Sequence, residues 1–324
     1  MMKCGENMSD IKLSLVVPCY NEEANVRPFY EACRAALDGK IDRYELVFVN
    51  DGSKDGTWKA LKALHAEDER VKAINFSRNF GKESAMYAGL QKAEGEFVTI
   101  IDADLQQRPE LALDMVAFLE ENEEYDSVAM FQKDRRESRV LSFFKKTFYR
   151  LINAMCDIDF RSGASDFRTL RHYVVDAVLD MKEYFRFSKG IFSWVGFNTH
   201  FMPYTAEERQ AGKTSWSFKK LFKYAVEGIT AFTTFPLKVS AYLGGLCSAF
   251  SLIYMLVVIV QKLFFGIDIP GYATLIVLIS FIGGIQLISL GVIGQYISKI
   301  YIEGKKRPIF VQKEYLDSQK QEKS

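Results

Sequence analysis

The chain has 324 residues, which is enough for one sizeable folded core and a further element. Its 42 lysine and arginine residues nearly balance its 41 aspartate and glutamate residues, so the overall charge does not indicate a nucleic-acid-binding protein. The five cysteines are scattered without a CxxC pair, which argues against a disulfide framework or a zinc site. The three histidines also lack the spacing of metal ligands.

Short apolar runs alternate with helical patterns up to about residue 131. We assign residues 1–10 to a polar tail, and the apolar run after it is too short for a signal peptide, so we expect this part in the cytoplasm. Strands are expected at Leu13–Val17, Glu45–Val49, Val71–Phe76, Phe97–Ile101 and Ser127–Phe131. Helices are expected near residues 23–38, 55–68, 81–94 and 110–122. The alternation predicts an α/β domain over residues 11–215, with a mostly parallel sheet covered by helices on both faces.

Polar clusters follow three of these strands. In a parallel sheet of this kind ligands bind at the carboxyl ends of the strands, so we expect the clusters to form the functional site. They are Pro18–Glu23, Asn50–Ser53 and Asp102–Asp104.

The sharpest feature is the pair Asp102 and Asp104, because two carboxylates after a buried strand suit a hard divalent cation such as Mg²⁺ or Mn²⁺. Gln106 is a candidate for a further oxygen ligand. An isolated Asp-x-Asp also occurs in ordinary turns, and its place after a strand is what favours a metal. Such a cation implies a diphosphate substrate, since it offsets charge on a leaving nucleotide. The chain lacks GxxxxGK[ST] and has no GxGxxG after the first strand, which argues against a P-loop NTPase and a dinucleotide oxidoreductase.

Two basic amphipathic helices are predicted at residues 136–155 and 217–229. Each has an apolar stripe flanked by lysines or arginines, a pattern typical of a helix that lies in the membrane interface. A helix packed on the domain core is the alternative for both. The second helix leads directly into an apolar segment, which favours the interfacial interpretation, and we assign residues 216–236 to it.

Two uncharged segments follow, at residues 239–260 and 272–297. Each exceeds the roughly 20 residues that span a hydrocarbon core, so residues 237–298 are expected to form a transmembrane helical hairpin. Lysines and arginines lie before and after the pair, whereas the connecting loop holds only Lys262. This distribution predicts that both ends of the hairpin lie in the cytoplasm.

Small residues in the second apolar segment allow another helix to approach closely, within the hairpin or between protomers. They are Gly283, Gly284, Gly291 and Gly294. A homo-oligomer, such as a tetramer, is therefore expected. The final segment, residues 299–324, is assigned to a cytoplasmic tail that we expect to be flexible after about Val311.

Four motifs in order resemble the family 2 glycosyltransferases, which have the GT-A fold. They are Val17–Glu23, Asn50–Thr57, Arg78–Glu83 and Asp102–Gln106. Together with the hairpin, they resemble the polyprenyl-phosphate glycosyltransferases, the group of bactoprenol glucosyltransferases and dolichol-phosphate mannose synthases. The resemblance covers about residues 11–310.

The resemblance implies a role for individual residues. A nucleotide-sugar pocket would be lined by Pro18, Tyr20, Glu22, Asp51, Ser53, Arg78, Lys82, Asp102 and Ala103. In this pocket Asp51 would hydrogen-bond the base, while Arg78 and Lys82 would face the diphosphate or the sugar. The metal would be held by Asp102, Asp104 and Gln106. Asp104 and Asp166 would be the catalytic residues, with Asp166 beside the reacting centre because Gly163–Arg168 resembles the Gly-x-x-Asp-Phe-Arg stretch of the family.

Some of these residues have simpler interpretations. Asn21 and Glu22 are also suited to capping the next helix, as are Asp55 and Thr57 at the following one. Asp166 is also placed to pair with a nearby arginine, Arg161 or Arg168. Its chemical role is open as well, because a lipid monophosphate is largely a dianion at neutral pH and needs no base.

A phosphorylated acceptor requires positive charge to hold it and to offset repulsion from the donor diphosphate. Such charge is offered by Arg135, Arg136, Arg139, Arg209 and Lys213. A solvated run of charges is the alternative for each of them.

We therefore expect inverting transfer of a sugar, glucose from UDP-glucose, to undecaprenyl phosphate at the cytoplasmic face of a membrane. UDP-N-acetylglucosamine, GDP-mannose and a modified pentose are the alternative donors. A processive polysaccharide synthase would add a Gln-x-x-Arg-Trp motif and more spans, which this sequence lacks. A membrane scaffold or small channel is disfavoured by the intact carboxylate pair and by a hairpin without internal charge. No nucleic-acid partner is expected.

Overall fold

The computed structural model describes residues 10–132, 164–205, 233–265 and 271–317. These residues belong to two compact units. The first unit contains the described residues up to 205 together with residues 308–317. The second contains residues 233–265 and 271–307. The predicted amphipathic helices at residues 136–155 and 217–229 lie outside the described residues, as do the five candidate acceptor cations, so their roles remain predictions.

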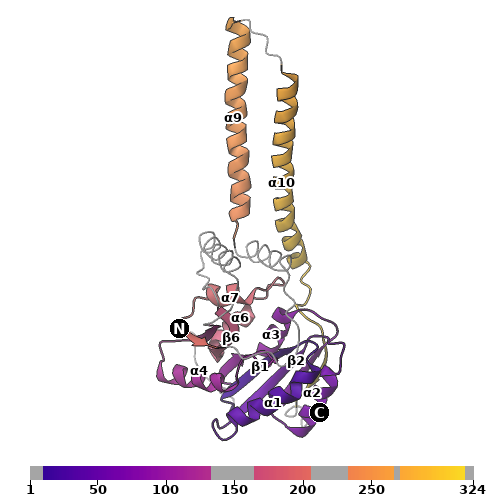
Figure 1. Cartoon of the computed structure of the whole chain (residues 1–324), viewed down its shortest axis with the longest axis vertical. Coiled ribbons are helices and arrows are strands. Elements are labelled where there is room, and N and C mark those ends of the chain that lie inside the picture. Colours follow the sequence, from indigo (N-terminus) through magenta and orange to yellow (C-terminus); the bar gives the residue numbers. More distant parts are fainter. Residues whose placement is uncertain (1–9, 133–163, 206–232, 266–270, 318–324) are drawn as a thin grey trace. The chain divides into compact units, whose positions relative to one another are not determined.

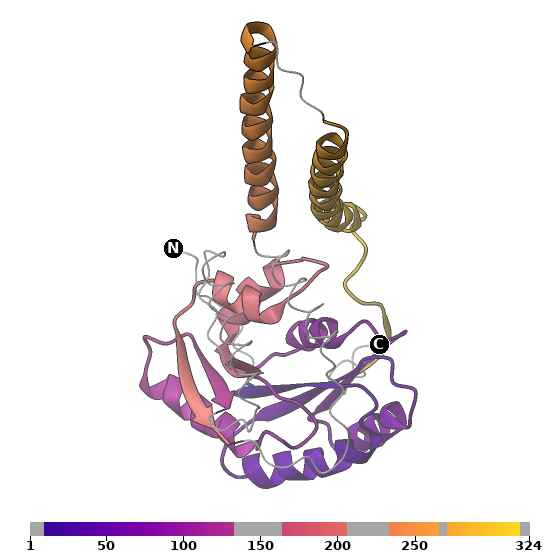
Figure 2. The same ribbon diagram turned by 45° about the horizontal axis from the view of Figure 1, so that its top comes forward.

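The first unit is built on one eight-stranded sheet of order β7-β5-β6-β4-β1-β2-β3-β8 (Figures 1 and 2). Its strands are β1 (Leu13–Cys19), β2 (Tyr44–Asn50), β3 (Val71–Phe76), β4 (Phe97–Ile100), β5 (Ser127–Gln132), β6 (Ala164–Arg171), β7 (Thr199–Tyr204) and β8 (Gln312–Leu316). The central strands β4, β1, β2 and β3 are parallel, whereas β6 and β8 run antiparallel to their neighbours. The expected mostly parallel α/β sheet is confirmed.

Helices cover both faces of this sheet (Figure 1). They are α1 (Glu23–Leu37), α2 (Thr57–Glu67), α3 (Lys82–Leu90), α4 (Glu110–Glu121), α6 (His172–Asp180) and α7 (Ser188–Trp194). One face packs against α1, α2 and α4, where the Phe29 and Phe48 rings meet edge to face with centroids 6.1 Å apart. The other face packs against α3 so closely that a Cβ at Gly89 would lie 2.3 Å from Val16 Cγ1. Glycine at that position therefore lets α3 lie directly on β1.

The expected strands and helices up to residue 131 are confirmed, with ends that differ by a few residues. Their apolar runs are buried on both faces, which is the pattern of central strands in a parallel sheet. The strands β6 and β7 and the helices α6 and α7 were not predicted. β6 contains charged residues at Asp166, Arg168 and Arg171, and β7 is only half-buried over most of its length, so neither is a continuous apolar run.

The expectation of a flexible tail after about Val311 was wrong. Residues Gln312–Leu316 form β8, which pairs antiparallel with β3 at the edge of the sheet. Glu314 accepts hydrogen bonds from Trp58 Nε1 at 2.8 Å and from Lys62 Nζ at 2.6 Å. The charged composition suggested disorder, but charged side chains are also common on edge strands, where one side of the strand faces water.

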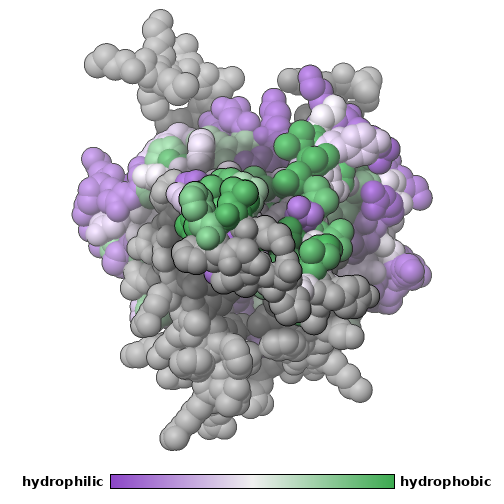
Figure 3. Space-filling model, turned by 90° about the horizontal axis from the view of Figure 1, so that it is seen from above, coloured by the Kyte–Doolittle hydropathy of each residue, from purple (hydrophilic) through white to green (hydrophobic). Residues whose placement is uncertain are grey.

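The second unit is a hairpin of two long helices, α9 (Phe235–Phe265) and α10 (Tyr272–Gly304). Each is long and apolar enough to cross a membrane, over Phe235–Gln261 and Val277–Gly304, and no side chain in the most apolar window of either is buried. Figure 3 shows hydrophobic side chains, in green, gathered over these helices. The Tyr296 hydroxyl donates to the Thr233 carbonyl at 2.6 Å. The expected apolar hairpin is confirmed.

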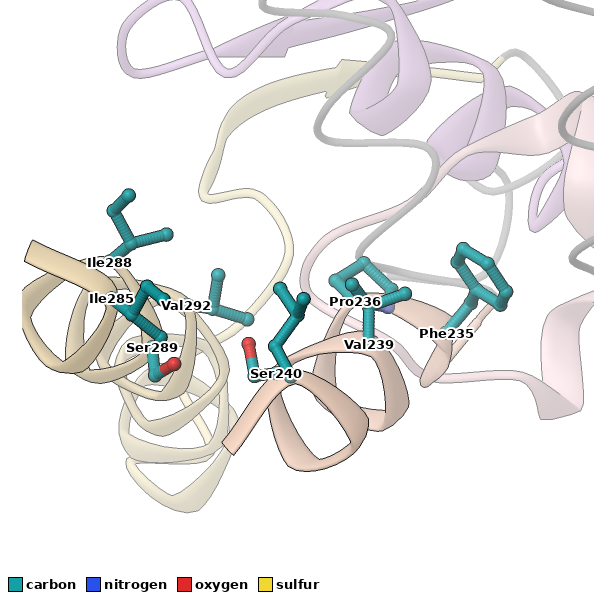
Figure 4. Close-up of a pocket in the computed structure, with 9 residues that line it drawn as sticks. Phe235, Pro236, Val239, Ser240, Ile285, Ile288, Ser289 and Val292 are labelled. Carbon is teal, nitrogen blue, oxygen red and sulfur yellow. The ribbon is translucent and has the colours of Figure 1, made fainter. Parts of the chain in front are cut away.

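A cavity of about 350 Å³ lies between α9 and α10 (Figure 4). It is lined by apolar side chains and by two hydroxyl groups, those of Ser240 and Ser289. The glycines of α10 play no part in the contact between the two helices, because a Cβ at Gly283, Gly284, Gly291 or Gly294 would meet no described atom within 4 Å. Among the described residues, these glycines therefore leave an open surface for lipid or another protomer.

Removal of the ring of Phe310 tests the docking of the C-terminal strand. Phe310 stacks on Phe76 with ring centroids 4.7 Å apart, next to β8. We expect Phe310→Ala to lower the free energy of unfolding of the sheet unit by about 2 kcal/mol, through lost burial and ring stacking. Denaturant unfolding of the full chain in detergent measures this change. Val311→Ala, at an adjacent side chain that is 45% exposed, serves as the control and should change little. Equal stability of Phe310→Ala and the wild type would contradict the docking.

Candidate active site

The loops after β1, β2 and β4 meet at one edge of the sheet. β1 lies between β2 and β4 and is parallel to both, and the chain order along the sheet reverses at this point. The Ile101 amide donates to the Val16 carbonyl at 3.0 Å, so the segment that follows β4 leaves the sheet beside β1. Such a switch point is where parallel sheets bind ligands. The expectation that the three polar clusters lie together is therefore met.

The loops after β1 and β2 are joined by hydrogen bonds. Asn21, in a left-handed conformation with φ 57°, donates its amide to Ser53 Oγ at 2.9 Å and accepts from the Lys54 amide at 2.9 Å. The Glu22 amide donates to Thr57 Oγ1 at 2.9 Å. Asn21 thus links the two loops rather than capping α1. Tyr20 is 43% exposed at the same edge and is accessible to a ligand.

Asp51 connects the second loop with the start of α3. It is 3% exposed, and its carboxylate accepts hydrogen bonds from the backbone amides of Phe80 at 2.6 Å and Gly81 at 2.9 Å. Burial raises the pKa of Asp51, and the two amide bonds act against this rise. The close approach requires Gly52, where a Cβ would lie 2.3 Å from the Arg78 carbonyl carbon. The structure therefore gives Asp51 a scaffolding role, and its predicted bond to a base stays a prediction.

Lys82 lies between two carboxylates that come from different strands. It is the first residue of α3, and its Nζ is 2.6 Å from Asp102 Oδ1 and 3.2 Å from Asp166 Oδ2. Asp102 follows β4, and Asp166 lies on β6, the antiparallel neighbour of β4. Three predicted site residues are thus brought together, and among the described residues Lys82 forms an ion pair with Asp166. Of the two arginines considered as partners from the sequence, Arg168 also acts on Asp166 through its charge, and Arg161 lies outside the described residues.

The charges around Asp166 keep it ionised. Burial acts to raise the pKa of this carboxyl, but the charges of Lys82, Lys189 and Arg168 outweigh burial and lower the pKa to about 2. Burial likewise acts to lower the pKa of Lys82, but the two carboxylates outweigh it and raise that pKa. Arg168 is 5% exposed, and burial lowers its pKa to about 10. Asp166 is therefore an anion that is held by cations and is a weak base.

The turn after Asp102 holds the second carboxylate of the Asp-x-Asp motif. The Gln106 amide donates to Asp104 Oδ1 at 3.2 Å, and the Asp102 amide donates to Gln107 Oε1 at 3.0 Å. Gln107, which the sequence did not single out, therefore fixes this turn. Ala103 between the carboxylates is 2% exposed, so its methyl group packs into the core.

The donor set fits a hard divalent cation that also binds substrate phosphates. In the part of the chain that the structure describes, no group of three or more His, Cys, Asp or Glu side chains is arranged to hold a metal alone. Magnesium and manganese commonly take only one or two carboxylates and complete their shells with water and phosphate oxygens. Asp102 and Asp104 supply such a pair.

The carboxylate of Glu83, on α3, was missed as a site residue by the sequence reasoning. Glu83 Oε2 accepts hydrogen bonds from the Ser188 amide at 2.9 Å and from the Ser188 hydroxyl, so it holds α7 against α3. Burial and the nearby charge of Asp166 raise the pKa of Glu83 to about 6. No local sequence pattern could have revealed this contact, because Glu83 and Ser188 are 105 residues apart in the chain and meet only through tertiary packing.

Removal of the Lys82 charge tests the electrostatic description of the site. We expect Lys82→Met to raise the pKa of Asp166 above its wild-type value of about 2, because one of the three cations that favour the carboxylate is lost. The stabilising contribution of Asp166 is present above about pH 4 and is lost as the pH falls towards 2, so the variant should lose it at a higher pH. Carbon-13 NMR of labelled aspartate in the full chain measures the titration. Lys59→Met, on α2, is the control, and an unchanged titration in Lys82→Met would contradict the description.

Two family models match this chain. Residues 14–179 match the model for glycosyl transferase family 2, and residues 235–300 match the model for the GtrB C-terminal hairpin. These ranges contain the site and the apolar hairpin, respectively.

Curated proteins resemble the chain over most of its length. An uncharacterised glycosyltransferase of Synechocystis is 42% identical over 302 residues, which cover 93% of this chain and 94% of that protein. The bactoprenol glucosyl transferase of Shigella phage SfV is 40% identical over 93% of this chain and 98% of that protein. A crystal structure of glucosyl-3-phosphoglycerate synthase from Mycobacterium tuberculosis with Mn²⁺ and UDP-glucose is 18% identical, with a TM-score of 0.45, over 68% of this chain and 77% of that one. The full-length similarity and the match at the site together show that the chain belongs to glycosyl transferase family 2 and is a glycosyltransferase.

Proposed function

We propose that this glycosyltransferase transfers glucose from UDP-glucose to undecaprenyl phosphate. The observation that carries the proposal is the Lys82 bridge between Asp102 and Asp166, at the ligand-binding edge of a family 2 domain whose chain also contains an apolar hairpin. Relatives that are 40% identical over 93% of this chain are named bactoprenol glucosyl transferases, which supports glucose as the sugar and a polyprenyl phosphate as the acceptor.

The donor diphosphate binds at the turn after β4. Asp102 and Asp104 would hold a divalent cation, Mg²⁺ or Mn²⁺, with Gln106 close to Asp104. When bound, this cation offsets the charge that develops on the departing nucleotide. Lys82 contributes a further positive charge beside Asp102. The loops that carry Tyr20, Glu22, Ser53 and Arg78 enclose the nucleotide at the same edge, as the family resemblance implies.

The charge state of Asp166 favours an orienting role over that of a general base. A carboxylate with a pKa of about 2 takes up a proton poorly near neutral pH. A phosphate monoester needs no base, because it is already largely a dianion. Its oxygen attacks the anomeric carbon from the face opposite the nucleotide and forms the new carbon–oxygen bond. The bond to the nucleotide breaks, its electron pair leaves with the diphosphate, and the configuration inverts without proton transfer.

Membrane attachment follows from the apolar hairpin, and its orientation is part of the proposal. Positive residues flank the hairpin, so we place both ends and the glycosyltransferase domain, residues 11–215, in the cytoplasm. The predicted basic helices at residues 136–155 and 217–229 lie outside the described residues; at the membrane interface, where we place them, their cations would be near the acceptor. The open glycine surface of α10 supports assembly of several copies.

A donor screen tests the function directly. Purified full-length protein with undecaprenyl phosphate and Mg²⁺ should form a glucosyl-lipid from UDP-glucose faster than the corresponding products from UDP-N-acetylglucosamine or GDP-mannose. Mass spectrometry of the lipid fraction identifies the sugar by its mass. Preferred use of another donor would overturn the choice of glucose, and no product with any donor would overturn the proposed activity.

The Asp-x-Asp carboxylates are tested by a matched pair of substitutions. Asp104→Asn should lower the rate of transfer at least about 100-fold, because it weakens the charge that holds the metal and the diphosphate. Excess EDTA should have the same effect on the wild type, and added Mg²⁺ or Mn²⁺ should reverse it. Asp114→Asn, at an exposed carboxylate of α4, makes the same chemical change away from the site and should retain activity. Retained activity in Asp104→Asn would remove this residue from the mechanism.

A further inference from the structure

The chain segment just before β8 packs against the loop between β3 and α3, which carries the predicted site residue Arg78. The Ser77 amide donates to the Val311 carbonyl at 3.0 Å, so pairing with the C-terminal segment continues past the end of β3 into this loop. Next to this bond, Phe310 stacks on Phe76, the last residue of β3, with ring centroids 4.7 Å apart and ring planes inclined by 17°. The start of the loop is therefore held by a segment from the other end of the chain.

Aromatic rings continue this contact as far as the Arg78 side chain. Phe76 also meets Phe80 edge to face, with ring centroids 5.8 Å apart and ring planes at 90°. The guanidinium of Arg78 lies 4.0 Å from the centroid of the Phe80 ring, and its Nη1 donates to the Asn79 carbonyl at 3.0 Å. We call the rings of Phe310, Phe76 and Phe80 the aromatic row. The row joins the C-terminal segment to the Arg78 cation through contacts between described residues.

The side chain of Arg78 is exposed, and its order depends on what it touches. The main chain of the loop is fixed separately, because Asp51 accepts the Phe80 amide and because a Cβ at Gly52 would lie 2.3 Å from the Arg78 carbonyl carbon. These contacts place Arg78 at the ligand-binding edge, but they leave its long side chain free to change rotamer. A ring beneath the guanidinium restricts this freedom through a cation–π contact. The orientation of the cation therefore depends on the position of the Phe80 ring.

We propose that Phe310 is a positioning residue: through the two rings between them, it orients Arg78 towards the diphosphate of the nucleotide sugar. A guanidinium suits this ligand because two of its N–H groups can bind two phosphate oxygens at once. A side chain that is already held in place also loses less entropy when the diphosphate binds. This inference rests on the proposed function, and it adds to that site a residue from the segment that follows α10, which ends at Gly304.

Steady-state kinetics of the full-length protein test the effect on the donor. Phe310→Leu, which keeps an apolar side chain but removes the ring, should raise the KM for UDP-glucose roughly 5-fold and leave the KM for undecaprenyl phosphate within about 2-fold. Phe310→Tyr, which keeps the ring, should restore the wild-type value. Glu314→Ala, which removes the contacts of β8 with Trp58 and Lys62 but no ring of the row, is the control and should leave both KM values unchanged. An equal rise in Glu314→Ala, or no rise in Phe310→Leu, would overturn the inference.

A double-mutant cycle shows whether the effect of Phe310 passes through Arg78. Arg78→Met should itself raise the KM for UDP-glucose, and adding Phe310→Leu to it should raise that KM little further, because the cation that the row positions is already absent. If the two substitutions instead multiply each other's effects, Phe310 acts independently of Arg78 and the inference fails.

The position of Arg78 is also measurable without turnover. In NMR of the full chain with labelled arginine, the ring current of Phe80 shifts the side-chain signals of Arg78. Phe310→Leu should change this shift and Glu314→Ala should not, whereas an unchanged shift in Phe310→Leu would overturn the inference. Addition of UDP with Mg²⁺ to the wild type should move the same signals, and lack of that response would overturn the contact with the diphosphate. Absence of sugar transfer by the wild type would overturn the proposed function alone, because these signals still decide the role of Phe310.

Discussion

The rest of the site depends on one lysine held between two carboxylates. Lys82 joins the turn after β4 to β6, and it stands at the start of the helix that packs on β1. Without a cation between them, Asp102 and Asp166 would repel each other at the edge where the substrate binds. The backbone supports the arrangement, because Asp51 accepts the amides of Phe80 and Gly81 just before Lys82. The buried carboxylate of Asp51 thus positions the lysine that orders the site.

The same charges restrict the chemistry that the site can perform. A carboxylate surrounded by cations stays ionised and accepts a proton poorly, so it suits an acceptor that arrives as an anion better than one that arrives as an alcohol. A phosphate monoester meets this condition at neutral pH. The electrostatics of Asp166 and the apolar hairpin are separate features of the chain, and both favour a lipid phosphate as the acceptor.

The central part of the fold could be predicted from the sequence because its signals are local. Buried parallel strands are continuous apolar runs, and the polar residues that follow them mark the ligand edge. The peripheral strands lack that signal: β6 carries Asp166 and Arg168 for the site, and β8 carries the charges of an edge strand. The motifs likewise singled out the polar residues that the structure brings together at this edge, but the sequence did not reveal which of them contact each other. The contacts of Asp166 with Lys82 and of Glu83 with Ser188 join segments 84 and 105 residues apart, and only the packing of α3 against β6 and α7 creates them.

The two units of the chain can be related to the two different substrates, a water-soluble donor and a lipid acceptor. The donor is a water-soluble molecule, and all of its proposed contacts lie in the sheet unit, within the range that matches the family 2 domain. The acceptor reacts only through its phosphate, and its long hydrocarbon tail has no chemical part in the transfer. The hairpin therefore need not recognise the structure of the hydrocarbon tail, since residence of the lipid in the membrane already concentrates its phosphate at the interface. Acceptor selection can then rest on charge and location, while the shape of the donor pocket decides the sugar.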